Sequence, residues 1–203
     1  MVSSHGTPPA DPAQGAKTAL RDQLLTDRNR RSLLERAAVA DAVAQHLLSA
    51  PEVRRAATVA AYVSVGAEPG TGPLLHALVA AGKRVVLPLL RPDDDLDWAL
   101  YRGDHDLRAA RRGLHEPTGP PLGLDAVATA DVVLVPGLAV SLSGERLGRG
   151  GGSYDRTLGR VPLGTFTCVL LHDDEVGLDV PTESHDRRVT AAASPAGITR
   201  LRR

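Results

Sequence analysis

Four short, continuously apolar segments constrain the fold of this chain more than any other feature. Valine, leucine and alanine dominate them, and each has the length of a strand that is buried on both faces. The segments are residues 58–65, 84–90, 131–135 and 164–171. Weaker strand patterns follow at residues 96–101 and in the tail after Val180. Strands of this kind indicate a largely parallel sheet that is covered on both faces.

Helical patterns separate these strands. Residues 26–49 place their apolar side chains mostly on one stripe, with Thr26 or Asp27 as the expected N-cap. Shorter helices are predicted at residues 17–25, 73–81 and 154–158. The alternation of helices and strands predicts an α/β fold, namely a three-layer α/β/α sandwich around a mostly parallel sheet.

The composition matches an ordinary globular protein and gives no global signal for a charged partner. The formal net charge is +0 and aromatic residues make up 2% of the 203 residues, so we expect no nucleic-acid surface. Cys168 is the single cysteine and lies in an apolar run, which predicts a core residue, no disulfide and a cytoplasmic setting. The sequence contains no segment long and apolar enough to span a bilayer.

The first residues differ in composition from the rest of the chain. Residues 1–16 are rich in serine, proline, glycine and alanine, and they lack the basic start and apolar stretch of a secretory signal. We therefore expect a disordered N-terminal extension at residues 1–16 and a single α/β domain over residues 17–203. We expect this domain to be a monomer.

The strongest functional signal is a glycine-rich loop at residues 146–155, which opens the predicted helix at 154–158. Glycines allow backbone N–H groups to point into one concavity, and a helix N-terminus adds partial positive charge. Arg146 and Arg149 add charged donors in a forked geometry that suits phosphate. This combination favours a phosphate site over a flexible surface loop. Its spacing matches neither a Walker A loop nor a dinucleotide-binding motif.

Several blocks of the sequence together resemble the 5-formyltetrahydrofolate cyclo-ligase family. The loop block consists of Pro136-Gly137-Leu138-Ala139, then residues 144–152, then Tyr154-Asp155. The other blocks run from Lys17 to Arg21, from Tyr62 to Thr71, from Gly113 to Pro117 and from Pro181 to Asp186. They occur in the order of the family and cover nearly all of the chain after Ala16.

The resemblance implies a fold similar to that of ribose-phosphate isomerases and CoA transferases. It also implies an enzyme that uses ATP and Mg²⁺ to convert 5-formyltetrahydrofolate to 5,10-methenyltetrahydrofolate. The implied ATP-binding residues are Lys17, Arg21, Arg146, Leu147, Gly148, Arg149, Gly150, Gly151, Gly152, Ser153 and Tyr154. Of these, Arg149 and Tyr154 are the implied catalytic residues.

The same resemblance implies a folate site and a metal site. The implied folate-binding residues are Val63, Glu68, Arg149, Gly150, Gly151, Gly152 and Ser153. Glu68 matches an acid that binds the pterin, and a carboxylate is able to accept from two pterin N–H groups. Asp155 and Asp186 match ligands of Mg²⁺, a cation that prefers oxygen donors. Without the resemblance, Lys17 and Arg21 form a solvated helix face, Asp155 is a helix N-terminal carboxylate and Asp186 is an ordinary loop acid.

One departure from the family pattern keeps alternatives open. Ser153 stands where the family usually has the first of two adjacent tyrosines, so an aromatic wall on the folate side of the loop is absent. A non-catalytic folate- or nucleotide-binding protein is therefore one alternative. A sugar-phosphate isomerase of similar fold is another, although likeness of fold alone is weak support for a function.

Overall fold

The structure of the protein is a computed structural model, and it describes residues 12–202. Its α-helices are α1 (Pro12–Asn29), α2 (Leu33–Ser49), α3 (Pro51–Arg55), α4 (Gly72–Ala80) and α5 (Ser153–Leu158). Its strands are β1 (Thr58–Ala60), β2 (Arg84–Leu90), β3 (Leu96–Leu100), β4 (Leu107–Ala109), β5 (His115–Pro117), β6 (Val132–Pro136), β7 (Ala139–Val140), β8 (Arg146–Leu147), β9 (Phe166–Leu170), β10 (Ala191–Ser194) and β11 (Gly197–Arg200).

Seven of the strands form one central sheet in the order β11-β10-β9-β6-β1-β2-β3. The five inner strands pair in parallel, whereas β3 and β11 add antiparallel edges. The expected α/β fold with a mostly parallel sheet is therefore confirmed. The chain passes from β1 outward to β2 and later returns to β6 on the other side of β1. The strand order therefore reverses between β1 and β6, and the carboxyl ends of these two strands diverge into separate loops.

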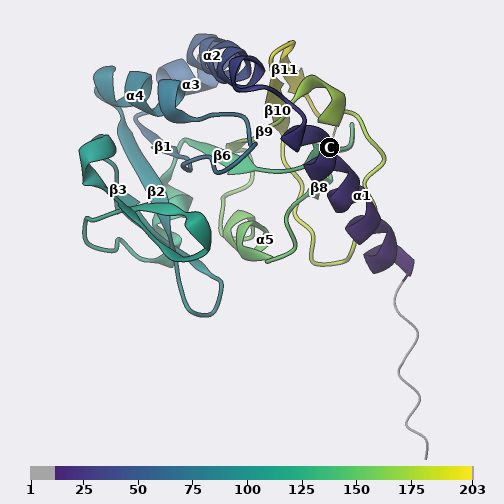
Figure 1. Ribbon diagram of the computed structural model, residues 1–203. Coiled ribbons are helices and arrows are strands. Elements are labelled where there is room, and N and C mark those ends of the chain that lie inside the picture. The colour runs from purple at the N-terminus through teal and green to yellow at the C-terminus, as the bar shows by residue number, and fades with distance from the viewer. Residues whose placement is uncertain (1–11, 203) are drawn as a thin grey trace, which may run out of the picture.

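Helices cover both faces of the sheet, which gives the three layers visible in Figure 1. Apolar side chains of α2, α3 and α4 pack with those of β1, β2, β6, β9 and β10 on one face. On the other face, the side chains of α5 and a 3-10 helix (Leu124–Thr129) pack against alternate residues of the same strands. The alternation within a strand explains why the strands are apolar throughout, since both sets of side chains are buried.

The first two helices differ from the prediction at their boundary. Residues 26–29 belong to α1, so neither Thr26 nor Asp27 caps the next helix. The cap of α2 is Ser32, whose Oγ accepts a hydrogen bond from the backbone N–H of Glu35. The carboxylate of Glu35 accepts in return from the backbone N–H of Ser32 at 2.7 Å. This reciprocal capping box satisfies two otherwise free backbone donors and defines the start of α2.

The N-terminal helix also begins earlier than expected. Residues 12–16, which the sequence analysis assigns to a disordered extension, form the first part of α1. Residues 1–11 of that predicted extension, and position 203 of the predicted domain, lie outside the described residues. Among residues 12–202, no helix has both the length and the apolar character needed to cross a membrane.

Strand β1 is shorter than the apolar segment that predicts it. The backbone N–H of Ala61 makes one further hydrogen bond across to Val86, and the chain then leaves the sheet. Beyond that point, Ser64 and Thr71 exchange hydrogen bonds, with each backbone N–H donating to the other residue's hydroxyl oxygen. Because side chains satisfy this backbone, the segment has no need of a neighbouring strand. Residues 62–68 thus form a loop at the carboxyl end of β1.

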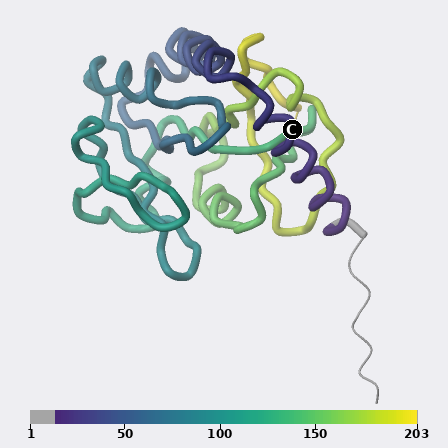
Figure 2. Tube along the Cα trace, in the orientation of Figure 1, coloured from purple at the N-terminus to yellow at the C-terminus, as the bar shows by residue number. Residues whose placement is uncertain are grey.

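A buried ion pair fixes α1 to the body of the protein. Arg28 donates to both carboxylate oxygens of Glu175, at 2.6 and 2.7 Å, and to the carbonyl oxygen of Gly137 at 2.7 Å. The two side chains are 1% and 2% exposed. In Figure 2 this helix runs alongside segments from the last third of the chain. The N-terminal helix is therefore held by residues that are more than a hundred positions away.

Candidate functional site

A cavity of about 1240 Å³ opens at the carboxyl ends of β1 and β6. This is the position at which parallel sheets most often bind ligands, because two loops separate there. All of the site residues predicted from the sequence line it. They are Lys17, Arg21, Val63, Glu68, Arg146, Leu147, Gly148, Arg149, Gly150, Gly151, Gly152, Ser153, Tyr154, Asp155 and Asp186.

The glycine-rich loop connects β8 to α5 and is braced from behind by Arg146. The guanidinium of Arg146 donates to the carbonyl oxygen of Pro136 at 3.0 Å and to Asp155 at 3.1 Å. A Cβ atom at Gly148 would lie 2.9 Å from Arg146 Nη1, so the loop backbone packs directly on this side chain. Arg146 is buried, and its charge is therefore partly committed to holding the loop in place.

Two loop glycines adopt backbone conformations that other residues avoid. Gly150 has φ 100° and Gly152 has φ 67°, values in the left-handed half of the map that favours glycine. Gly152 also precedes α5, and its carbonyl oxygen accepts the first helical hydrogen bond, from Arg156 N, at 3.1 Å. The loop therefore turns sharply onto the N-terminal end of a helix.

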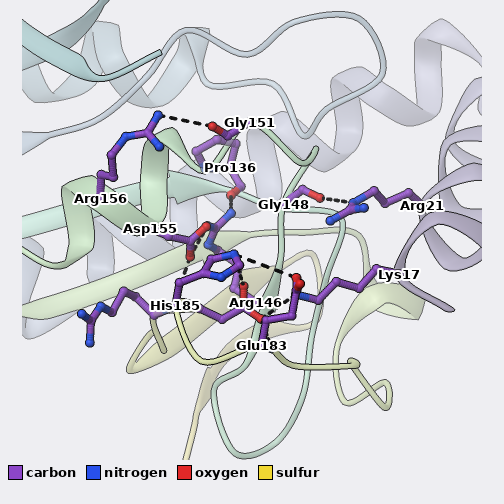
Figure 3. A network of polar contacts seen from close by, with 12 residues as sticks. Lys17, Arg21, Pro136, Arg146, Gly148, Gly151, Asp155, Arg156, Glu183 and His185 are labelled. Carbon is purple, nitrogen blue, oxygen red and sulfur yellow. Dashed lines mark hydrogen bonds and ion pairs between the residues drawn. The ribbon is translucent and has the colours of Figure 1, made fainter. Parts of the chain in front are cut away.

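Two basic residues of α1, Lys17 and Arg21, reach this loop and the C-terminal segment, as Figure 3 shows. Arg21 Nε donates to the carbonyl oxygen of Gly148 at 2.9 Å. Lys17 Nζ contacts Glu183 at 2.5 Å and Asp186 at 2.7 Å. Burial alone would lower the pKa of Lys17, but the hydrogen bonds to Asp186 and Glu183 raise it, so the amine stays charged. The structure thus brings Lys17 and Arg21 into the site and does not leave them as a solvated helix face.

One ion pair joins the glycine loop to the loop that follows β1. Arg149 Nε lies 3.2 Å from Glu68 Oε1, and the side chains are 52% and 6% exposed. The other oxygen of Glu68 accepts from the backbone N–H of Val65 at 2.9 Å. Burial raises the pKa of Glu68, although the Val65 N–H and the charge of Arg149 act in the opposite direction. Glu68 is therefore a carboxylate in an environment that disfavours its charge, with one oxygen directed to the half-exposed Arg149.

An aromatic pair forms the apolar floor between these two loops. The rings of Tyr62 and Tyr154 meet edge to face with centroids 6.5 Å apart, and the Arg146 guanidinium lies 6.0 Å from the centre of the Tyr154 ring. Burial raises the pKa of both tyrosines. The Tyr62 hydroxyl has no hydrogen-bond partner within the described residues, so a buried polar atom faces the cavity region unpaired.

Carboxylates suited to a cation gather at the C-terminal side of the cavity. The ligand atoms of Glu183, His185 and Asp186 all lie within 4.8 Å of one another, and Lys17 binds two of the three. Carboxylate oxygens are the donors that Mg²⁺ prefers, and the ammonium of Lys17 balances part of their negative charge. Asp155 has different partners, since Oδ1 accepts from Arg146 at 3.1 Å and from Arg187 N at 3.2 Å.

Sequence reasoning missed several residues that line the cavity. The sequence assigns no role to Tyr62, which lies in a predicted strand and a family block, or to Glu183, which lies in a family block. Arg156 follows the glycine-rich loop and donates to its backbone, at Gly151 O, at 3.3 Å. The sequence contains a signal for this contact. Arg156 lies in the first turn of the predicted helix, where side chains tilt toward the helix N-terminus and therefore toward the glycine-rich loop. Glu116, from another family block, is also buried beside the cavity and accepts a hydrogen bond from the Leu90 N–H at 2.9 Å.

Comparisons with known proteins agree on one family. The sequence model of the 5-formyltetrahydrofolate cyclo-ligase family matches residues 13–195. A 5-formyltetrahydrofolate cyclo-ligase from Mycolicibacterium smegmatis is 43% identical over 92% of this chain and 98% of its own length. The Escherichia coli protein of that name is 34% identical over 76% of this chain and 87% of its own. The solution structure of 5,10-methenyltetrahydrofolate synthetase from Aquifex aeolicus superposes with a TM-score of 0.79 at 28% identity, covering 92% of this chain and 93% of that one.

Proposed function

This chain belongs to the 5-formyltetrahydrofolate cyclo-ligase family, and we propose that the cavity between β1 and β6 is its active site. The family reaction is the ATP-dependent cyclisation of 5-formyltetrahydrofolate to 5,10-methenyltetrahydrofolate, a ligation that forms a C–N bond. The observation that supports the proposal most is the contact of Arg149 with Glu68 at 3.2 Å. It places the phosphate-type loop and the acid expected to bind folate next to each other in one cavity.

The glycine loop is assigned to ATP. Residues 146–154 supply backbone donors, and Lys17, Arg21 and Arg149 add positive charge around them. Phosphate oxygens are held by such donors without any change in the protonation of the protein. Tyr154 lies under the loop and against Tyr62, where it supports the floor on which the reacting groups meet.

The loop after β1 is assigned to the folate. Glu68 presents one carboxylate oxygen toward the cavity and Val63 lines the same wall. A pterin has adjacent N–H donors that fit a carboxylate. A buried carboxylate with a raised pKa gains most from such donors, because they replace the hydration that it has lost.

The reaction then requires the two ligands to meet between these loops. The formyl oxygen attacks the γ-phosphorus of ATP, and ADP leaves with the electrons of the broken P–O bond. The folate N10 next attacks the activated formyl carbon, and the C–O bond breaks to release phosphate, which takes up the proton that N10 loses. The protein contributes positioning and neutralisation of the phosphate charge, with no covalent intermediate on its own side chains. Arg149, between the two ligand sites, is the side chain best placed to follow the transferred phosphoryl group.

Mg²⁺ is assigned to the acidic side of the cavity. Asp186, with Glu183 beside it, offers carboxylate oxygens that fit this cation, and Asp155 borders the same cavity. When bound together with ATP, Mg²⁺ would neutralise charge on the phosphates. Lys17 contacts both Glu183 and Asp186 and holds them in position from α1.

The test of the function is the absorbance of the methenyl product formed from 5-formyltetrahydrofolate, with ATP and Mg²⁺ present or omitted. We expect many turnovers per protein molecule and one ADP for each product molecule. Binding of both ligands without product would favour the non-catalytic alternative, and absence of both binding and product would refute the assignment. The family match and the named relatives do not favour the sugar-phosphate isomerase. A monomeric state, a cytoplasmic location and the absence of a nucleic-acid partner stay predictions.

A further inference from the structure

Arg156 joins the glycine loop to a distant turn of the chain. It lies on the exposed side of α5, and its Nη2 atom donates to two backbone carbonyl oxygens. One belongs to Gly151, at 3.3 Å, and the other to Asp94 in the turn between β2 and β3, at 2.6 Å. Figure 3 shows the guanidinium reaching from its helix to the loop at Gly151. The guanidinium of Arg156 therefore connects the glycine loop to the β2–β3 turn.

The bond to Gly151 restricts the orientation of one peptide group. A trans peptide is planar, so its C=O and the following N–H point in opposite directions. When Arg156 holds the carbonyl of Gly151, the N–H of Gly152 is turned to the other side of the chain. A loop binds phosphate only when its N–H groups face the anion and its carbonyl oxygens face away. The bond from Arg21 to the Gly148 carbonyl has the same effect on the N–H of Arg149.

The turn that receives Arg156 is itself held in an unusual conformation. Asp94 has φ 61°, a value that few residues other than glycine adopt. Contacts hold it from two sides, because its carbonyl accepts from Arg156 and its carboxylate lies 2.8 Å from Arg112 Nη2. The next residue, Asp95, is buried and pairs with Arg160 at 2.6 Å. Such conformations persist only where the surrounding structure maintains them.

The fit between Arg156 and the loop is close. A Cβ atom at Gly152 would lie 3.1 Å from Arg156 Nη1. Glycine is therefore suited to this position both by its φ angle and by the side chain that packs on it. The arginine does not extend freely into solvent as an ordinary exposed side chain does, because both of its acceptors are main-chain atoms with fixed positions.

We propose that Arg156 is a positioning residue for ATP, acting through the Gly151–Gly152 peptide. It holds the loop open for phosphate by removing one carbonyl oxygen from the anion's side, and it fixes the loop to the β2–β3 turn. The proposal rests on the assignment of the glycine loop to ATP given above. Lysine at this position retains the charge, but its amine lies one bond closer to the backbone than Nη2, so it reaches the two carbonyl oxygens less well.

The test compares Arg156→Ala and Arg156→Lys with the wild-type protein. The probe is the non-hydrolysable ATP analogue with a β,γ-imido bridge, together with Mg²⁺, measured by calorimetry. The alanine variant loses a charge-assisted contact that orders the loop, so its affinity for the analogue should be about tenfold weaker than that of wild type. We expect the affinity of the lysine variant for the analogue to be about threefold weaker than that of wild type. The KM for ATP should rise in parallel, while kcat at saturating ATP and the KM for folate stay within about twofold of wild type.

Arg160→Ala is the matched control, because Arg160 is a nearby arginine that binds the same turn through the carboxylate of Asp95. It removes a turn contact without touching the loop. We expect a lower melting temperature and an unchanged affinity for the analogue. The proposal is overturned if Arg156→Ala binds the analogue as wild type does, or if Arg160→Ala loses affinity equally. Failure of the wild type itself to bind the analogue would instead refute the ATP assignment.

Discussion

Replacement of Glu68 by glutamine separates a binding role from a structural role. Glutamine has the same shape, so its side-chain oxygen is able to keep the 2.9 Å bond from Val65 N. The amide nitrogen would then occupy the place of the oxygen that faces Arg149 at 3.2 Å. The cavity therefore loses the charged acceptor oxygen of Glu68, while the backbone N–H of Val65 keeps its hydrogen-bond partner.

The expected effect on folate binding follows from that single lost acceptor. Hydrogen bonds to a charged group contribute about 1.5–3 kcal/mol, so the Kd for 5-formyltetrahydrofolate should rise about 10- to 150-fold. Thermal stability should not fall, because a neutral amide avoids the cost of burying a charge, the same cost that raises the pKa of Glu68. Affinity for ATP should change little, since Arg149 stays in place.

The pH dependence gives an independent check with a defined sign. The charged groups that face Glu68 are Arg149 and Arg28, and both are arginines that keep their charge over the accessible range. As pH falls through the raised pKa of Glu68, the wild-type carboxylate becomes neutral and folate affinity should decline toward that of Glu68→Gln. The variant should show no such step. The free energy of unfolding of the wild type should depend on pH in the opposite direction. The cost of burying the Glu68 charge is absent at low pH, and it lowers stability as pH rises through the raised pKa.

The assay is a calorimetric titration of 5-formyltetrahydrofolate without ATP, so that no turnover occurs, combined with thermal melts at two pH values. Glu116→Gln is the control, since Glu116 is another buried carboxylate beside the cavity that accepts a backbone N–H. We expect its folate affinity to equal that of wild type. Equal folate affinity in Glu68→Gln, together with a lowered melting temperature, would show that Glu68 is a structural acid and refute the reasoning.

Three further variants test other parts of the structure. Arg28→Met leaves the carboxylate of Glu175 buried without its partner, and urea denaturation should show a loss of about 3–5 kcal/mol; a loss below about 1 kcal/mol would contradict this. Ser153→Tyr should strengthen folate binding by about 0.5–1.5 kcal/mol through ring contact, whereas weaker binding by a folded variant would show that the pocket has been rebuilt around serine. Asp186→Asn should shift the Mg²⁺ titration of activity to higher concentrations, and a curve that coincides with that of wild type would remove Asp186 from the metal site.

The central sheet could be predicted from sequence because its signal is local. Strand β2 occupies the predicted residues 84–90, and β6 and β9 fall within a residue or two of their predicted ranges. The boundary before α2 was also readable, because Ser32 and Glu35 have the spacing of a capping box. The prediction placed the cap at Thr26 or Asp27, which are residue types favoured at N-caps but lie within α1.

The contacts within the site could not be predicted from local pattern. Lys17 meets Glu183 across 166 positions, and Arg28 meets Glu175 across 147. Such pairs depend on where the sheet places distant segments, and charge alone does not specify the partner. The same limit explains Arg146, expected only to offer its charge to phosphate. The structure shows that it also braces the loop through Pro136 O.

The attachment of α1 has a consequence for synthesis of the chain on the ribosome. The side chains that hold this helix, Glu175, Glu183 and Asp186, are synthesised 147 to 169 positions after the basic residues they bind. During translation α1 therefore waits without its partners, with the cations of Lys17 and Arg28 still hydrated. The nucleotide side of the cavity is thus completed only after residues 175–186 have left the ribosome. A nascent chain arrested before residue 175 would have most of the sheet and none of the carboxylates that dock the first helix.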